Sequence, residues 1–67
     1  MSVSYKKLWH LLLDRDMKKK DLAKVSGISP YTINKLNSDG NVTVEVIEKI
    51  CLALDCKVDD ILEFNKE

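Results

Sequence analysis

Residues that build catalytic and metal centres are scarce in this sequence. Its 67 residues include one histidine, His10, and two cysteines, Cys51 and Cys56. The cysteines lack the Cys-x-x-Cys spacing of zinc sites, and neither a cluster of His, Cys and acidic residues nor a phosphate-binding glycine loop is recognisable. We therefore expect no enzymatic activity, no metal and no cofactor, and no small-molecule ligand is evident.

Long apolar runs and signal sequences are also missing. The segment MSVSYKKLWHLLLDRD places two lysines before a short apolar run, but it has no small-residue cleavage site and ends in charged residues. No run reaches the length of a transmembrane helix. We expect a cytoplasmic protein without membrane contact. Cys51 and Cys56 are then reduced thiols of the core, with a disulfide between them as the less favoured alternative.

The composition fits one small folded domain. Hydrophobic residues make up 45% of the chain and charged residues 33%, which is ordinary for a globular protein and argues against disorder. No repeat, linker or low-complexity tract divides residues 1–67, so we expect a single domain. A core of this size often needs support from a second subunit.

The net charge of zero hides an uneven distribution. Residues 1–40 contain eight lysines and arginines against four aspartates, whereas residues 41–67 contain three lysines against seven acids. The segment 18-KKK-20 is the densest basic run. The pattern predicts a positive face that suits an anionic partner and a negative face, although scattered solvated charges are the plain alternative.

The apolar residues recur with a helical period along nearly the whole chain, and no strand is predicted. Five helices are expected. The first covers roughly 4–15 with Leu8, Leu11 and Leu12 inward; the second covers roughly 19–26 with Leu22 and Ala23 inward and Gly27 at its end.

The third begins after the cap Ser29 with Pro30 and ends near Asn37; the fourth covers about 44–54 behind the cap Thr43. A short fifth helix has Asp59 and Asp60 in its first turn, and Ile61, Leu62 and Phe64 close the core.

One spacing carries functional information. Ala23, Gly27, Ile33 and Leu36 follow one another at intervals of four, six and three residues. A small residue allows close helix packing, the glycine allows a tight turn, and the two apolar residues anchor the next helix. This is the helix-turn-helix arrangement, expected at about 19–38, in which the second helix lies in the DNA major groove.

The chain resembles the Cro/C1-type helix-turn-helix regulators of bacteria and phages. The matching segments are 17-MKKKDLAKVSGIS-29, 32-TINKL-36, 45-EVIEKICLALDC-56 and 58-VDDILEF-64. The resemblance implies a compact, all-α, lambda-repressor-like domain of five short helices.

Four positions depart from the usual pattern of that family. Lys18 stands where a capping Ser or Thr is common, which removes about 1 kcal/mol of capping that Asp21 partly offsets. Lys19 stands where a phosphate-binding Gln is common. Leu12 and Asn37 stand where the family often has an Arg–Glu ion pair, and we expect an apolar contact there instead.

The outward residues of the third helix are then candidates for reading DNA. Asn reads adenine, Lys reaches guanine, and the Thr methyl contacts thymine. Lysines near a helix N-terminus suit phosphate. The predicted base contacts are Ser29, Tyr31, Thr32, Asn34 and Lys35, and the predicted phosphate contacts are Lys18, Lys19, Lys20, Asn37 and Ser38.

Two functions of different classes remain. The first is sequence-specific binding of double-stranded DNA by a small transcriptional regulator, as a homodimer at least on DNA. The apolar line Tyr5, Trp9 and Leu13 is either ordinary core or, with the fifth helix, a dimer contact. The second is a protein-interaction module, such as the antitoxin of a toxin–antitoxin pair, for which the acidic second half offers a surface.

Overall fold

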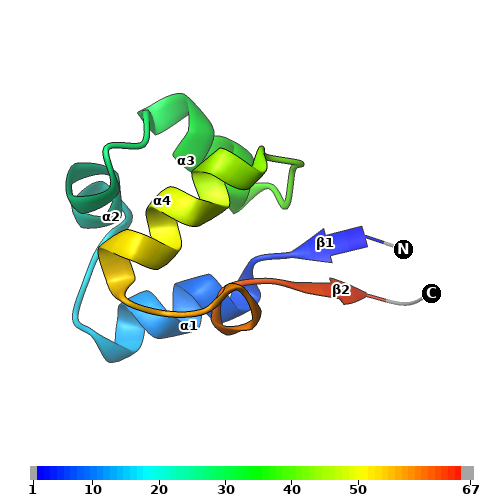
Figure 1. Cartoon of the computed structure of the whole chain (residues 1–67), viewed down its shortest axis with the longest axis horizontal. Coiled ribbons are helices and arrows are strands. Elements are labelled where there is room, and N and C mark those ends of the chain that lie inside the picture. The colour runs from blue at the N-terminus through cyan, green and yellow to red at the C-terminus, as the bar shows by residue number, and fades with distance from the viewer. Residues whose placement is uncertain (1, 66–67) are drawn as a thin grey trace.

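Four α-helices make up most of the chain in the computed structural model, which describes residues 2–65 (Figure 1). The elements are, in order, β1 Ser2–Ser4, α1 Lys6–Asp14, α2 Lys19–Ser26, α3 Pro30–Asn37, α4 Val44–Leu54, the 3-10 helix η1 Val58–Asp60, and β2 Glu63–Asn65. None of these helices combines the length and the apolarity that crossing a membrane requires.

Five helices were expected, but residues 2–65 form four α-helices. The last segment forms only the single 3-10 turn η1, in which Ile61 N–H bonds to Val58 C=O at 3.1 Å. The apolar residues expected to close the core in this segment differ in burial. Ile61 is fully buried, whereas Phe64 is 64% exposed and does not close the core.

Two short strands were missed altogether. β1 and β2 pair antiparallel, with Val3 opposite Phe64, and bring the two ends of the chain side by side (Figure 1). Three residues are too few to show an alternating pattern, and the partners lie about sixty positions apart, so no local signal marks them. The first helix consequently begins at Lys6 instead of near Ser4.

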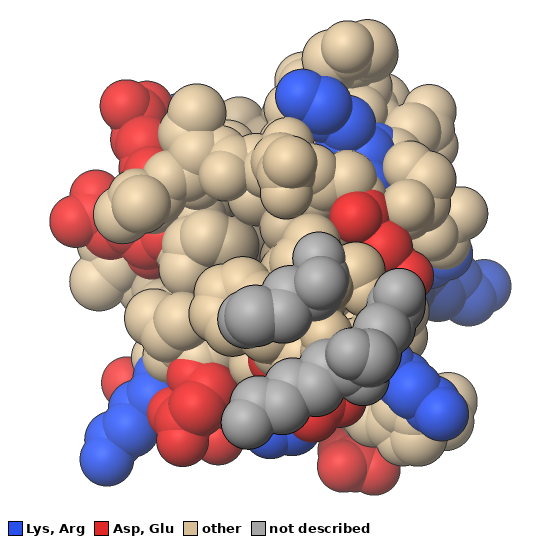
Figure 2. All heavy atoms as spheres, turned by 90° about the vertical axis from the view of Figure 1, so that its right-hand side faces the viewer, with Lys and Arg blue, Asp and Glu red and all other residues tan. Residues whose placement is uncertain are grey.

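The end of the molecule that carries the strands bears charges of both signs. Figure 2 shows basic side chains interspersed with aspartates and glutamates around this face. The predicted separation into a positive and a negative face therefore does not extend to it.

The core gathers residues from every helix. Its fully buried side chains are Leu8, Leu22, Leu36, Ile50, Leu54 and Ile61. Leu11, Ala23 and Leu62 are only partly buried against this cluster. Helix α2 packs on α4 and on α3, so it is the element that connects the helix-turn-helix to the rest of the core.

Tyr5 ties the start of α1 to the turn after α3. Its side chain is 2% exposed, and its hydroxyl donates to the Gly40 carbonyl at 2.9 Å. Its backbone N–H donates to the Asp39 carboxylate at 3.1 Å. Tyr5 is therefore core and not part of a surface line with Leu13, which is 76% exposed.

The second helix is capped from its own first turn. The Lys18 side chain has no acceptor and makes no capping bond, but the Asp21 carboxylate accepts the Lys18 backbone N–H at 2.9 Å. This is one half of a capping box, and it supplies a capping hydrogen bond at the start of α2 that the Lys18 side chain cannot make.

Replacing Tyr5 by Phe tests the tie to the α3–α4 turn. The change removes one hydrogen bond and should lower the free energy of unfolding by about 1 kcal/mol. Burial, and then the negative charge of Asp39, raise the pKa of Tyr5 above its ordinary value of 10.0. The folded state thus holds the phenol proton more tightly, so wild-type stability is intact below pH 10.0 and falls above it. Urea unfolding as a function of pH should show the gap to Tyr5→Phe narrowing above that pH. Tyr31→Phe, which removes a phenol at an exposed position, is the control. It should change neither the free energy of unfolding nor the dependence of that free energy on pH.

Replacing Lys18 by Ser tests the cap of α2. A serine at this position completes the capping box with Asp21 and should raise the free energy of unfolding by about 1 kcal/mol. The gain should disappear in the double variant with Asp21→Ala if the two residues act as one box. Urea unfolding followed by circular dichroism measures both, and a destabilised Lys18→Ser variant would contradict the assignment.

Candidate nucleic-acid interface

The turn between α2 and α3 depends on Gly27. Gly27 has φ +73° and ψ 16°, and its N–H bonds to Ala23 C=O at 3.0 Å, which ends α2 in a left-handed cap. A Cβ at Gly27 would meet no atom within 4 Å. The glycine is needed for its backbone conformation and not for space.

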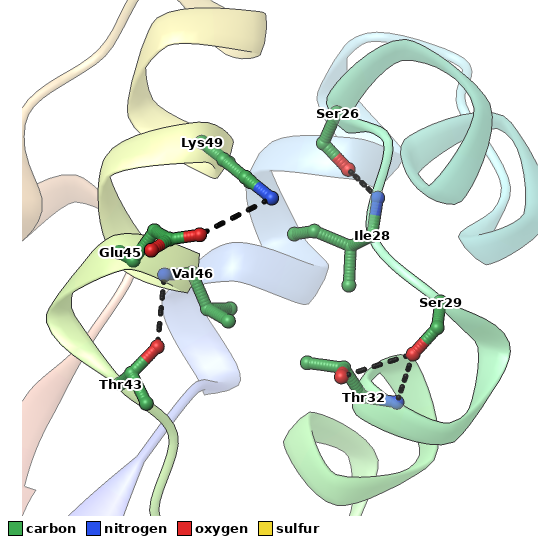
Figure 3. Close-up of polar contacts among 8 residues, drawn as sticks. All are labelled: Ser26, Ile28, Ser29, Thr32, Thr43, Glu45, Val46 and Lys49. Carbon is green, nitrogen blue, oxygen red and sulfur yellow. Dashed lines mark hydrogen bonds and ion pairs between the residues drawn. The ribbon is translucent and has the colours of Figure 1, made fainter.

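Helix α3 starts at a serine cap, as predicted. The Ser29 hydroxyl accepts the Thr32 N–H at 3.2 Å and lies 3.1 Å from the Thr32 hydroxyl (Figure 3). Thr43 caps α4 in the same way, accepting the Val46 N–H at 3.3 Å (Figure 3). The polar atoms of Ser29 and Thr32 therefore already serve the helix, and Thr32 is half-buried.

Three side chains on the outward face of α3 are exposed to solvent. Ile33 and Leu36 are buried, whereas Tyr31 is 73% exposed and Asn34 and Lys35 are also exposed. The predicted division of α3 into an inward and an outward side is confirmed for these five residues, whereas Thr32, which was also predicted to face outward, is half-buried. Tyr31 does not pack into the core.

Lys19 and Asn37 join the two helices of the motif. The Lys19 ammonium donates to the Asn37 side-chain carbonyl and lies 4.6 Å from the centre of the Trp9 ring. Trp9 is partly buried against the core, so the lysine rests on a fixed aromatic face. The polar partner of Asn37 is thus Lys19, whereas an apolar contact with Leu12 was expected.

The Ser38 hydroxyl is engaged by its own helix. It donates to the Asn34 and Lys35 carbonyls at 3.3 and 3.1 Å. Ser38 is exposed, so its oxygen still faces solvent and can accept, but its proton is directed to the end of α3.

A groove of about 490 Å³ runs between α2 and α3. Its lining comprises Lys19, Lys20, Ala23, Lys24, Pro30, Ile33 and Asn34. Three lysines thus contribute to a lining that also includes apolar residues and contains no acid. Lys24 was not predicted as a site residue; its position one turn after Lys20 on the same helix is the signal that sequence reasoning passed over.

The arrangement offers a binding surface. Within residues 2–65 no group of three or more His, Cys, Asp or Glu side chains is placed to hold a metal ion. What the two helices combine is an exposed polar face on α3 and a cluster of lysines beside it, and such a surface suits a polyanion.

Known proteins show a clear relationship to this chain. Residues 7–67 match the Cro/C1-type HTH DNA-binding domain. A crystal structure of the transcriptional regulator VanUg superimposes with a TM-score of 0.93 at 47% sequence identity, covering 98% of this chain and 88% of that one. No curated protein sequence gives a significant match. The chain therefore belongs to the Cro/C1-type helix-turn-helix DNA-binding domain family.

Proposed function

We propose that this protein binds specific double-stranded DNA sequences as a transcriptional regulator, with α3 in the major groove. The observation that carries the proposal is the outward face of α3, where Tyr31, Asn34 and Lys35 stand exposed beside the lysine-lined groove. The similar protein VanUg is described as a transcriptional regulator, which supports the same class of function here.

Each of the three exposed residues contacts a different kind of base. Asn34 bonds to the N6 and N7 edge of adenine, and Lys35 reaches O6 and N7 of guanine. Tyr31 contributes an aromatic surface against a thymine methyl. Because the Ser29 hydroxyl accepts the Thr32 backbone N–H and bonds to the Thr32 hydroxyl, the main contribution left to this pair is the Thr32 methyl group.

The lysines around α2 hold the phosphate backbone. Lys18 and Lys20 are exposed beside the first turn of α2, where the helix dipole favours anions. Lys19 is oriented by Asn37 and Trp9, so it loses less side-chain entropy when it meets a phosphate. Lys24 adds a further lysine one helical turn after Lys20. Asn37 and Ser38 approach the phosphate backbone of the DNA from the C-terminal end of α3.

The protein acts as a homodimer on a two-fold site. One α3 helix of eight residues offers few base contacts, too few for tight specific binding by a monomer. In the apolar line expected at the dimer contact, Tyr5 is buried and Trp9 is partly buried. Leu13, which is 76% exposed at the end of α1, is the member most available for that contact. Half-sites are then expected about 10 base pairs apart.

Selection of bound duplexes from a random DNA pool tests the proposal directly. With competitor DNA at physiological salt, we expect enrichment of a two-fold site whose spacing reports the dimer geometry. A single short site would contradict the dimer but retain specific DNA binding. No enrichment would contradict DNA reading and favour the protein-interaction module.

Two lysine variants separate base reading from backbone binding. Lys35→Ala should cost about 1–3 kcal/mol on the selected site and relax the preference at one position. Lys20→Ala should weaken binding to all sequences alike and reduce the salt slope by about 1. Lys57→Ala, which removes the same charge after α4, is the matched control and should change neither. Fluorescence anisotropy titrations at several salt concentrations measure all three, and equal losses for Lys35→Ala on every sequence would refute base reading.

A further inference from the structure

The end of α4 brings two cysteines into one turn. Asp55 adopts φ 50° and ψ 56°, and the Cys56 N–H then bonds back to the Cys51 carbonyl at 3.1 Å. This is the bond of a Schellman motif, in which the side chains of the two bonded residues commonly touch. In this protein both residues of that pair are cysteines.

The two thiols are free and share one environment. Both are half-buried and pack against the main core. Burial, the neighbouring Cys51 thiol and then Asp60 raise the pKa of Cys56 to about 11, although Arg15 opposes them. At neutral pH the Cys56 sulfur is therefore protonated, which makes it a slow nucleophile toward peroxides and disulfides.

A ligand that condenses with neutral thiols fits this pair better than an oxidant. A trivalent arsenical of the type R–As=O forms two As–S bonds, and its oxygen leaves as water with the two thiol protons. Arsenic stays trivalent and both sulfurs keep their oxidation state, so the step needs neither oxidant nor reductant. It does need two thiols held next to each other, which the cap of α4 provides.

We propose that Cys51 and Cys56 form a two-thiol binding site for a thiophilic trivalent metalloid, assembled by the C-terminal cap of α4. The site is separate from the proposed DNA-reading surface, because α4 ends well away from α3 (Figure 1). Binding at this site is thus an activity independent of the proposed function, and its test requires no DNA.

Intact-mass spectrometry of the full chain with phenylarsine oxide is the first test. We expect one phenylarsine group per chain, replacing two hydrogens, that survives excess 2-mercaptoethanol and is removed by dithiothreitol. Cys51→Ser and Cys56→Ser should each bind roughly 100-fold more weakly, because the second bond is lost. Two groups per chain, no adduct, or undiminished affinity of a single-cysteine variant would overturn the proposal.

Thermal unfolding tests whether the fold assembles the site. Saturating phenylarsine oxide should raise the unfolding midpoint of the wild-type protein, because the reagent bridges residues that the native cap holds together. The single-cysteine variants should show no shift. An unchanged wild-type midpoint would refute assembly by the cap. If a serine variant does not unfold cooperatively, the corresponding alanine variant replaces it.

Discussion

The position of α3 depends on two hydrogen bonds from Tyr5. The backbone N–H and the phenol of this residue bond to Asp39 and Gly40, the two residues that turn the chain after α3. A helix of eight residues is not stable by itself in water. At its start α3 is fixed by the Gly27 turn and the Ser29 cap, and at its end by Tyr5. The exposed face proposed to read DNA is therefore held from both ends and from beneath by Ile33 and Leu36.

Local signals made the middle of the chain predictable. The expected bounds of the second and fourth helices, 19–26 and 44–54, are confirmed, and so is the start of α3 at Pro30. Each of these helices carries its own caps and its own apolar stripe, so neighbouring residues are sufficient to define it. The β1–β2 pair was missed because its energy comes from residues at opposite ends of the chain, and η1 was called a helix because acids in a first turn suit a 3-10 turn equally well.

For the candidate site, the sequence was sufficient to predict which side of α3 faces outward. The apolar spacing of Ile33 and Leu36 settles which face of α3 is buried and therefore which face is exposed. The partners of polar atoms were predictable only within a helix end, as for the caps Ser29 and Thr43. Partners on another helix were not predictable, because they depend on how the helices pack. Lys19 meets Asn37 and Trp9 only when α1 and the last turn of α3 lie on either side of it. The groove that includes Lys24 likewise exists only between two packed helices.

The chain contains only two glycines, and three of its helix ends use aspartate in the backbone conformation that glycine commonly adopts. Asp16, Asp39 and Asp55 all have positive φ values, at places where glycine is the common residue. A left-handed residue with a side chain costs about 1–2 kcal/mol, and Asp somewhat less because its side chain tolerates this region. At Asp39 the carboxylate accepts the Tyr5 N–H, and a hydrogen bond to a charged group contributes about 1.5–3 kcal/mol. The contribution and the cost are of similar size, so aspartate can take the place of glycine at this turn and also ties α3 to the start of α1.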